Sequence, residues 1–522
     1  MTAAAPPTDV VVVGAGPVGL LLASELARRG VEVVVLERRD APTTASRAST
    51  LHARTMEIFD SRGLLPHFGS PPGEVRGHFG GIPMDLTLPS SHPGQWKVPQ
   101  TATEAVLQRE ACALGAVLRR GTEVVEVVED TGRVRVRAVG PGGDVVIPAS
   151  YVVACDGEDS TVRRLVGADF PGHDAVRELL RADVAGIDVR NRRFERLDDG
   201  LAIAARRADG VTRVMVHAFG ARVRERQDET SFEEITAAWK QVTGEDISSG
   251  TPLWVNSFGD ASRQLTRYRH GRVLFAGDAA HRQMPIGGQA LNLGLQDAFN
   301  LGWKLAAVIR GENTGELLDS YHDERHAVGA GVLSNIRSQA LLLLGGPEVE
   351  SLRSVLAELM GHEEVRARLA GMISGLDIRY DMGGGAHPLP GTRLPPSTLR
   401  VGPDAVTTAA LLRGGGGVLL DLTGRRGGVA RHAGWQDRIT VVRGQAERGS
   451  APDLPADAVL VRPDGYVAWA GEGERGLTEA LTRWFGPSAD TATGQFRAGA
   501  FHHKFRPSPG GISHHGSDRG RC

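Results

Sequence analysis

Three glycines and an acidic residue near the start of the chain have the spacing of a site for a phosphate-bearing cofactor. Gly14, Gly16 and Gly19 follow the apolar run DVVVV, and Glu37 ends a second apolar run, VEVVVL. Gly14 permits a tight turn, Gly16 lets the backbone approach a pyrophosphate, and Gly19 lets a helix pack closely on a strand. The helix N-terminus favours negative charge, and Glu37 can accept hydrogen bonds from both hydroxyls of a ribose without a 2′-phosphate. This pattern predicts a dinucleotide site. Its further residues are Ala15, Pro17 and Arg38.

A second acidic residue favours FAD over NAD as the cofactor. The stretch LFAGDAAH places Asp278, after Gly277, at the end of an apolar strand, which is the ligand side of an open α/β sheet. A carboxylate there can accept hydrogen bonds from a polyol, and FAD has a ribityl chain that NAD lacks. The helix N-terminus that follows could stabilise negative charge on a reduced flavin. The residues of this loop are Pro285, Gly287, Gly288, Gln289, Ala290, Leu291 and Asn292. The alternative for both motifs is a glycine-rich turn that binds no ligand.

The elements that must position these residues predict an α/β fold. DVVVVGAG and YVVACDG fit strands buried in a parallel sheet, and PVGLLLASELARRG has helical spacing. Residues 99–121 predict one amphipathic helix, and the segments after it, ending in DVVIPAS, predict an antiparallel meander. Alternating segments and one helix between residues 176 and 268 predict a second sheet. A Pro- and Gly-rich linker at 387–396 leads to a small α/β module, and the aperiodic chain after about Phe496 is expected to be disordered.

Composition bounds the class of protein. A chain of 522 residues is too long for one core, and its net charge of -2 gives no reason to expect a nucleic-acid or membrane-surface partner. No apolar run reaches the roughly 18 residues of a membrane span, and the N-terminus lacks the features of a signal peptide. Cys112, Cys155 and Cys522 form no CxxC pair. We therefore expect a cytoplasmic protein in a reducing compartment. We expect no metal site.

A third element completes a resemblance to a known family. CDGEDSTVRRLVG carries Asp156 at the end of a strand and Arg163 on the helix that follows. Together with the N-terminal GxGxxG and the later Gly-Asp pair, this order resembles the group A flavoprotein aromatic hydroxylases, which share the para-hydroxybenzoate hydroxylase fold. The similarity extends to about Phe485. Other stretches resemble the subgroup that acts on bacterial aromatic polyketides, especially angucyclinones; they are SRASTLHARTMEIFDSRGLLPHFG, GHFGGIPMDL, VPQTATEAVL, LLDSYHDERHAVG and VRPDGYVAWAG.

The resemblance implies three domains. They are a Rossmann-like FAD-binding domain of the para-hydroxybenzoate hydroxylase type, an inserted β-sheet substrate domain and a C-terminal thioredoxin-like domain. The last lacks the CxxC motif, so it cannot do dithiol chemistry. The implied boundaries are 1–75, 99–175 and 271–345 for the FAD-binding domain, 76–98 and 176–270 for the substrate domain and its excursion, 346–396 for a helical segment and linker, 397–490 for the thioredoxin-like domain, and 491–522 for a disordered tail.

The resemblance also implies roles for individual residues. Arg47, in SRAST, would approach the FAD diphosphate, and Gln100, in VPQ, would contact the ribityl or ribose region. Asp156 and Arg163 belong to a motif that the family associates with both FAD and the nicotinamide donor. The family usually has Gly at the position of Ala290, and a methyl group there could restrict the backbone or the movement of the flavin.

The activity that the resemblance implies is hydroxylation of a polycyclic aromatic polyketide, an angucyclinone in the closer subgroup, in antibiotic biosynthesis. NADPH or NADH would reduce FAD, and O2 would add to give a flavin C4a-hydroperoxide. The distal oxygen would go to an electron-rich phenolic ring, and water would leave. The protein must shield the peroxide from water. The nicotinamide donor would bind transiently, because no second dinucleotide motif is visible. The sequence identifies no catalytic base and leaves the oligomeric state open.

Aromatic, sulfur and imidazole side chains near these motifs are candidates for substrate contact. They are Phe79, Trp96, Trp254, Phe258, His281 and Met284. Such side chains more often belong to the core, and a histidine beside a Gly-Asp turn more often makes a local hydrogen bond than acts as a base. Three other functions stay open: Baeyer–Villiger oxygenation of a polyketide ketone, flavin reduction without oxygen insertion, and non-catalytic binding of a flavin or pigment.

Overall fold

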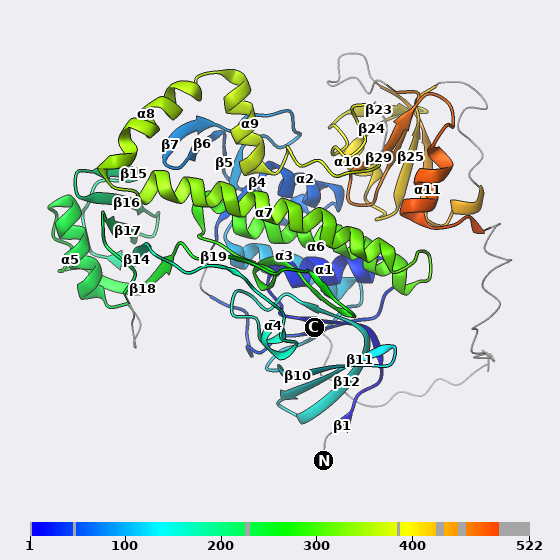
Figure 1. Ribbon diagram of the computed structural model, residues 1–522, viewed down its shortest axis with the longest axis horizontal. Helices are drawn as coiled ribbons and strands as arrows, with labels where there is room; N and C mark the ends of the chain where they lie inside the picture. Colours follow the sequence, from blue (N-terminus) through cyan, green and yellow to red (C-terminus); the bar gives the residue numbers. More distant parts are fainter. Residues whose placement is uncertain are drawn as a thin grey trace.

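The centre of the computed structural model is a sheet with the strand order β10-β11-β12-β2-β3-β9, in which β21 also pairs with β12 (Figure 1). The structure describes residues 3–44, 48–224, 230–383, 387–423, 433–446 and 456–489. β2 (Thr8–Val13), α1 (Pro17–Arg28) and β3 (Val33–Leu36) form the predicted strand–helix–strand unit, with β2 and β3 parallel. Val10, Val11 and Val12 are fully buried, as expected for an inner strand with both faces covered.

Two sequence predictions for this sheet were wrong in detail. The helix predicted over 99–121 ends early: α3 is Gln100–Ala113, and after Gly115, with a φ of +101°, the chain forms β9 (Val117–Arg119), which pairs in parallel with β3. The two strands predicted around Ser150 are one strand, β12 (Gly143–Ala154). Its first half pairs antiparallel with β11, and its second half pairs parallel with β2 and β21. The apolar pattern changes at this point because the strand passes from a half-exposed meander into a buried sheet.

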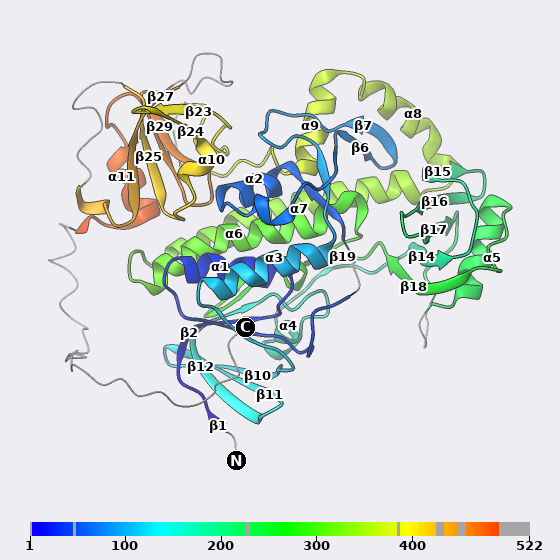
Figure 2. The same cartoon turned by 180° about the vertical axis from the view of Figure 1, so that it is seen from behind.

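Helices cover one side of the central sheet. α1 packs against α3 and against α6 (Gln289–Ile309), and α6 packs against α7 (Glu316–Leu344), as the two opposite views show (Figures 1 and 2). The other elements of this part are β1 (Ala3–Ala4), β10 (Glu123–Asp130), β11 (Arg133–Gly140), α4 (Thr161–Leu165), β13 (Gly172–His173), β19 (Ser262–Gln264), β20 (Arg269–His270), β21 (Val273–Phe275) and β22 (His281–Arg282).

Helix α7 is long and apolar enough to cross a membrane by length and composition, which the sequence analysis did not anticipate. Half of its most apolar window is buried inside the protein, and it packs against α6 and against strands of the second sheet. Those contacts account for the apolar side chains as packing within the fold.

The second sheet has the order β15-β16-β17-β14-β18 and is antiparallel. Its strands are β14 (Glu178–Ala185), β15 (Arg192–Leu197), β16 (Gly200–Arg206), β17 (Thr212–Ala218) and β18 (Thr251–Gly259). α5 (Phe232–Thr243) covers one face and buries Ile235 and Trp239 there. The opposite face meets the C-terminal part of α7, where Leu179 and Leu201 contact Ile336 and Leu343 in a single apolar cluster.

Further short elements lie between β3 and α3 and after α7. They are β4 (Thr50–His52), α2 (Ala53–Ser61), β5 (Gly73–Glu74), β6 (Arg76–Phe79), β7 (Ile82–Asp85), β8 (Gln95–Lys97), α8 (Glu350–Leu359) and α9 (Glu363–Ser374). β4, β8 and β5 form one small sheet, and β6 and β7 form a hairpin that packs against α9.

The C-terminal module has its own sheet, with the order β26-β25-β28-β29. Its elements are β23 (Thr398–Val401), β24 (Asp404–Thr407), α10 (Thr408–Leu411), β25 (Gly417–Asp421), β26 (Ile439–Arg443), β27 (Gln445–Ala446), β28 (Ala458–Val461), β29 (Val467–Gly471) and α11 (Leu477–Phe485). β25 and β26 are parallel, and the other pairs in this sheet are antiparallel. The tail predicted to be disordered, 491–522, lies outside the described residues.

Candidate active site

The first glycine-rich turn joins β2 to α1 and leaves space at the start of the helix. Gly14 has a φ of +103°, and a Cβ there would lie 2.4 Å from the carbonyl oxygen of Cys155. A Cβ on Gly19 would lie 2.1 Å from the carbonyl oxygen of Gly14, whereas one on Gly16 would meet no atom within 4 Å. α1 has no side-chain cap. The outer glycines are therefore needed for packing, and the middle one faces open space beside uncapped amides.

Glu37 lies directly beside this turn. Its Oε2 accepts a hydrogen bond from the Ala15 amide at 2.9 Å, and its Oε1 accepts one from the Arg39 amide at 3.0 Å. Pro17 is buried at the first position of α1, and Arg38 is exposed. Of the two further residues expected here, Gln100 begins α3 and donates to Glu104 at 2.8 Å. The other, Arg47, lies outside the described residues.

The Asp-Gly motif after β12 is joined to the Gly-Asp turn after β21. Asp156 Oδ2 accepts from the Val162 amide at 3.0 Å, while its buried Oδ1 has no hydrogen-bond partner among the described residues. Arg163 donates from Nη1 to the carbonyl of Ala279 at 3.0 Å, and its guanidinium lies 3.9 Å from the centre of the Phe170 ring. Arg163 thus ties together two motifs that lie more than a hundred residues apart in the sequence.

The Gly-Asp turn is held in place by a buried carboxylate that the sequence analysis missed. Asp297, on α6, accepts from the Gly277 amide at 3.1 Å and from Arg325 Nε at 2.7 Å, and it pairs with His281 Nε2 at 2.7 Å. Although burial alone would raise it, Arg325 and His281 hold the pKa of Asp297 below its usual value. Asp278, by contrast, is exposed at the end of the strand. His281, a candidate substrate residue, is therefore fully buried and helps to hold the Gly-Asp turn in place through Asp297.

The loop before α6 is anchored to β4 and α2. Gly287 and Gly288 have φ values of +64° and +70°, in the left-handed region that favours glycine. The Gly287 carbonyl contacts His52 Nε2 at 2.7 Å. Asn292 Oδ1 accepts from the His52 amide at 2.9 Å and from Thr55 Oγ1 at 2.6 Å. Burial lowers the pKa of His52 to about 4. The imidazole is therefore neutral near pH 7.

The remaining loop residues differ in how far they are buried at the start of α6. Ala290 and Leu291 are half-buried in the first helical turn, Gln289 is buried, and Pro285 is exposed. Within the described parts of the chain, no side chain caps α6, and its first turn holds no acidic residue. The helix dipole has its positive end at the N-terminal amides of α6, and no acidic side chain of the first turn neutralises it.

Two of the six candidate substrate residues meet between this loop and the second sheet. Met284 is buried in an apolar cluster with Leu179 and Ile286, and Phe258 packs against it. We call these residues, with the α7 side chains they contact, the sheet-face cluster. Trp254 lies on the same strand as Phe258.

An arginine that the sequence analysis missed links these aromatic residues. Arg181, buried on β14, lies 4.1 Å from the centre of the Trp254 ring and 5.5 Å from that of Phe258. Its strand, ELLRADVA, carries three buried charged residues, and that pattern was the signal that could have found it. The other candidates lie elsewhere: Phe79 packs with the β6–β7 hairpin, and Trp96 against the core of the central sheet.

A second buried polar group lies at the opposite end of α6 and α7, against the C-terminal module. Glu324 accepts from Arg462 Nη1 at 2.5 Å and from Lys304 Nζ at 2.8 Å, and Arg462 also pairs with Asp464. We call these four residues the interface ion cluster. Burial would raise the pKa of Glu324, but Arg462 and Lys304 lower it to about 2, and burial lowers the pKa of Lys304 to about 8.

Two known families match separate parts of the chain. The family described as FAD binding domain matches residues 7–336, and the family described as aromatic-ring hydroxylase, C-terminal, matches residues 387–488. These two matches span the sheets, the cofactor motifs and the C-terminal module described above.

Individual relatives are similar along almost their whole length. The chain is 41% identical over 509 residues to a 12-dehydrotetracycline 5-monooxygenase/anhydrotetracycline 6-monooxygenase of Streptomyces rimosus, covering 92% of this chain and 99% of the relative. It is 40% identical over 491 residues to a rifampicin monooxygenase of Streptomyces venezuelae, covering 92% and 98%. Among solved structures, CabE, an aromatic hydroxylase from angucycline biosynthesis, superposes with a TM-score of 0.89 at 47% identity, covering 92% of this chain and all of that one.

Proposed function

Because the chain belongs to the family of FAD-binding aromatic-ring hydroxylases, we propose that it hydroxylates a polycyclic aromatic polyketide, an angucyclinone, with NAD(P)H and O2. It is a monooxygenase, and its cofactor is FAD. A relative named for anhydrotetracycline and a solved hydroxylase from angucycline biosynthesis both support a planar substrate of several rings in antibiotic biosynthesis. We further propose a cytoplasmic location and the domain boundaries expected from the sequence.

The residues at the ends of β2, β12 and β21 fit FAD. Open space in front of Gly16 and the uncapped start of α1 suit a pyrophosphate, and Glu37 beside them suits the adenosine ribose. The buried, unpartnered Oδ1 of Asp156 is a polar atom that a bound group can satisfy. Asp278, exposed at the end of β21, would hold the ribityl chain. Ala15, Pro17, Arg38, Arg47, Gln100 and Arg163 are assigned to the same site.

When bound, FAD supplies the redox chemistry by accepting hydride from NAD(P)H and activating O2. The residues of this chain would orient the aromatic ring and keep water away from the reacting atoms. The sheet-face cluster, with Met284 and Phe258, offers the apolar surface for that purpose. The uncapped amides at the start of α6 would stabilise negative charge on the ring system.

One observation carries this proposal. The loop before α6 packs against the second sheet through Met284, Ile286, Leu179 and Phe258. Arg163 ties the Gly-Asp turn, which comes shortly before this loop in the chain, to the Asp-Gly motif. The elements assigned to FAD and an apolar, aromatic-lined surface therefore meet at one place. That juxtaposition is what a flavin enzyme acting on an aromatic ring requires, since oxygen must pass directly between the two.

Anaerobic stopped-flow absorbance of the FAD-loaded protein tests the proposal. The protein is mixed with NADPH, and separately with NADH, with and without a tetracyclic angucyclinone, and oxygen is then admitted. We expect the angucyclinone to accelerate bleaching of the flavin and to gain one oxygen atom by mass.

The product decides between the alternatives. Because both routes add one oxygen atom, NMR of the product separates a new phenol from the ester of a Baeyer–Villiger reaction. Flavin reduction without any oxidised product would indicate a reductase, and slow reduction that the ligand does not accelerate would indicate a non-catalytic binder. Either result would overturn the hydroxylase assignment.

A further inference from the structure

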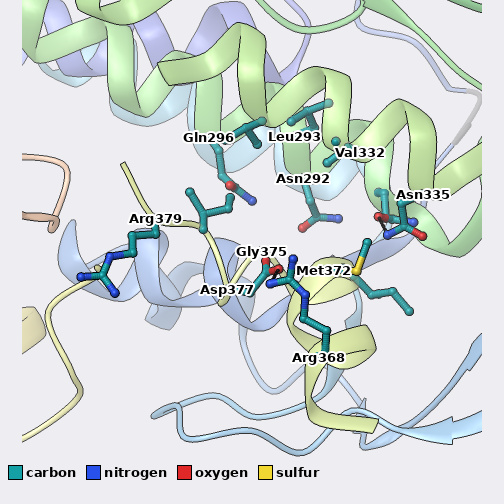
Figure 3. Close-up of a pocket in the computed structure, with 15 residues that line it drawn as sticks. Asn292, Leu293, Gln296, Val332, Asn335, Arg368, Met372, Gly375, Asp377 and Arg379 are labelled. Carbon is teal, nitrogen blue, oxygen red and sulfur yellow. Dashed lines mark hydrogen bonds and ion pairs between the residues drawn. The ribbon is translucent and has the colours of Figure 1, made fainter. Parts of the chain in front are cut away.

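A cavity of about 340 Å³ lies along α6 (Figure 3). α6 and α7 form one side of it, and α9 with the segment 375–379 forms the other. The cavity adjoins the sheet-face cluster at Val332, which packs against that cluster and also lines the cavity. Its position therefore places it next to the loop assigned to the flavin.

Two buried amide side chains in this cavity each have one atom without a hydrogen-bond partner among the described residues. Gln289 is 3% exposed and Gln296 is 8% exposed. Among the described residues, Gln289 Nε2 has nothing to donate to and Gln296 Oε1 has nothing to accept from. An unsatisfied buried polar group is unfavourable, because it has lost its hydrogen bonds to water without gaining others. Both groups line the cavity, so a ligand there can satisfy them.

The spacing of these amides sets the length of such a ligand. Gln289 and Gln296 lie on the same face of α6, seven residues apart, which at a rise of about 1.5 Å per residue is roughly 10 Å along the axis. Leu293 and Asn292 lie between them, Val332 and Asn335 line the cavity from α7, and Met372 and Ile373 line it from α9. The site is thus elongated, with apolar side chains along its walls and, among the described residues, an amide with an unpartnered atom near each end.

The mouth of the cavity does not suit a phosphate. Its two exposed arginines are engaged within the protein: Arg368 pairs with Asp377 at 3.1 Å, and Arg379 donates to the carbonyl of Pro388 at 2.9 Å. Asp377 also lines the cavity, and its carboxylate would repel a phosphate, whereas a flat ring system would use the apolar walls and leave the arginine contacts in place.

We propose that this cavity holds the polycyclic aromatic polyketide lengthwise along α6. A carbonyl oxygen at one end of the ring system accepts from Gln289 Nε2, and a phenolic hydroxyl at the other end donates to Gln296 Oε1. The proposal rests on the proposed function. It adds the orientation of the ligand and the two groups that form hydrogen bonds with its ends. Gln296 is then a specificity-determining residue, because a ligand without a donor at that end leaves its Oε1 unsatisfied.

Binding measurements on the FAD-loaded protein test this assignment. Anhydrotetracycline and a tetracyclic angucyclinone are titrated while the flavin fluorescence is followed. Gln296→Leu removes one hydrogen-bonding end and should weaken binding about three- to tenfold, the range of a single hydrogen bond. Met372→Trp fills the cavity and should weaken binding by more than tenfold. Leu359→Trp, at an exposed position of α8, is the matched control and should bind as the wild type does.

FAD content and thermal unfolding are measured for each variant. If Met372→Trp proves to be misfolded, Gln296→Leu alone decides the assignment. If the wild type binds and oxidises a polyketide while both cavity variants bind it equally well, the cavity assignment falls and the proposed function stands. If the FAD-loaded wild type binds neither probe, the ligand class is wrong and both fall.

Discussion

Helices α6 and α7 carry buried polar side chains at both ends, and the two ends differ in how those side chains are satisfied. At the end against the C-terminal module, the charged groups of Lys304, Glu324, Arg462 and Asp464 are all paired with one another. At the end beside the flavin loop, Gln289 and Gln296 each leave an atom without a partner among the described residues. The same two helices therefore combine a group of charges that are all paired with two neutral amides that are only partly hydrogen-bonded.

The difference separates structure from function. A buried network whose charges are all paired needs no ligand, and removing one partner leaves an uncompensated buried charge that destabilises the fold. A buried amide that faces a cavity without a partner costs stability for as long as the cavity lacks a ligand. The comparison predicts opposite responses when each end is made apolar.

The largest effect is expected from breaking the paired end. Glu324→Ala leaves Arg462 and Lys304 buried without their carboxylate, which should lower the free energy of unfolding by about 3–5 kcal/mol. Denaturant unfolding measures the loss, and Glu358→Ala, on the exposed α8, is the control. A loss below about 1 kcal/mol would mean that the interface ion cluster contributes no more than a surface ion pair.

As pH falls, the flavin-loop end should lose its contribution to stability at a higher pH than the paired end. His52 contacts the Gly287 carbonyl, and its pKa is lowered to about 4 from an ordinary 6.5. The unfolded chain therefore binds the proton first as pH falls, so stability present above pH 6.5 is lost on the way to pH 4. The loss between pH 7 and pH 5 should be about 2 kcal/mol.

Unfolding at several pH values checks this, with His52→Gln as the comparison. The variant should lose stability less steeply between pH 6.5 and 4 than the wild type. The pKa of Glu324, about 2 against an ordinary 4.5, is depressed in the folded state. Its contribution is therefore complete above pH 4.5 and is lost only between pH 4.5 and 2. Equal slopes for both proteins above pH 4.5 would contradict the role given to His52.

The smallest effect is expected at the unpaired end. Gln296→Leu replaces a buried amide that lacks a partner for Oε1 with an apolar side chain of similar size, so the free energy of unfolding should stay within about 1 kcal/mol or rise. Thermal unfolding without a polyketide gives the answer. A loss comparable to that of Glu324→Ala would show that the amide is already satisfied within the fold.

Local sequence patterns predicted the parts of the site that lie within one stretch of chain. The strand–helix–strand unit, the tight turn at Gly14 and the close packing at Gly19 follow from apolar periodicity and glycine spacing, and the fold class expected from the resemblance is confirmed. β9 was missed because it has only three residues, although Gly115 after the helix was a usable stop signal. Asp297 and Arg325 were missed because their partners come from other elements, although a charged residue inside the apolar stretch of α6 was a usable signal.

The cavity could not be predicted at all. Gln296, Met372 and the segment 375–379 meet only after α9 folds back over α6, and no local spacing relates them. Likewise, Phe79 and Met284 were proposed together on residue type, but the structure places them in different apolar clusters. Which aromatic side chains face a ligand depends on sheet register, which the sequence leaves open.

The course of β12 has a consequence for the order in which the chain can fold during synthesis. Its second half pairs with β2, near the start of the chain, and with β21, whose residues 273–275 emerge much later. The whole second sheet is made between those two partners. The ribosome must therefore deliver more than half of the chain before the central sheet can close, and until then the edge of β12 is exposed to non-native pairing.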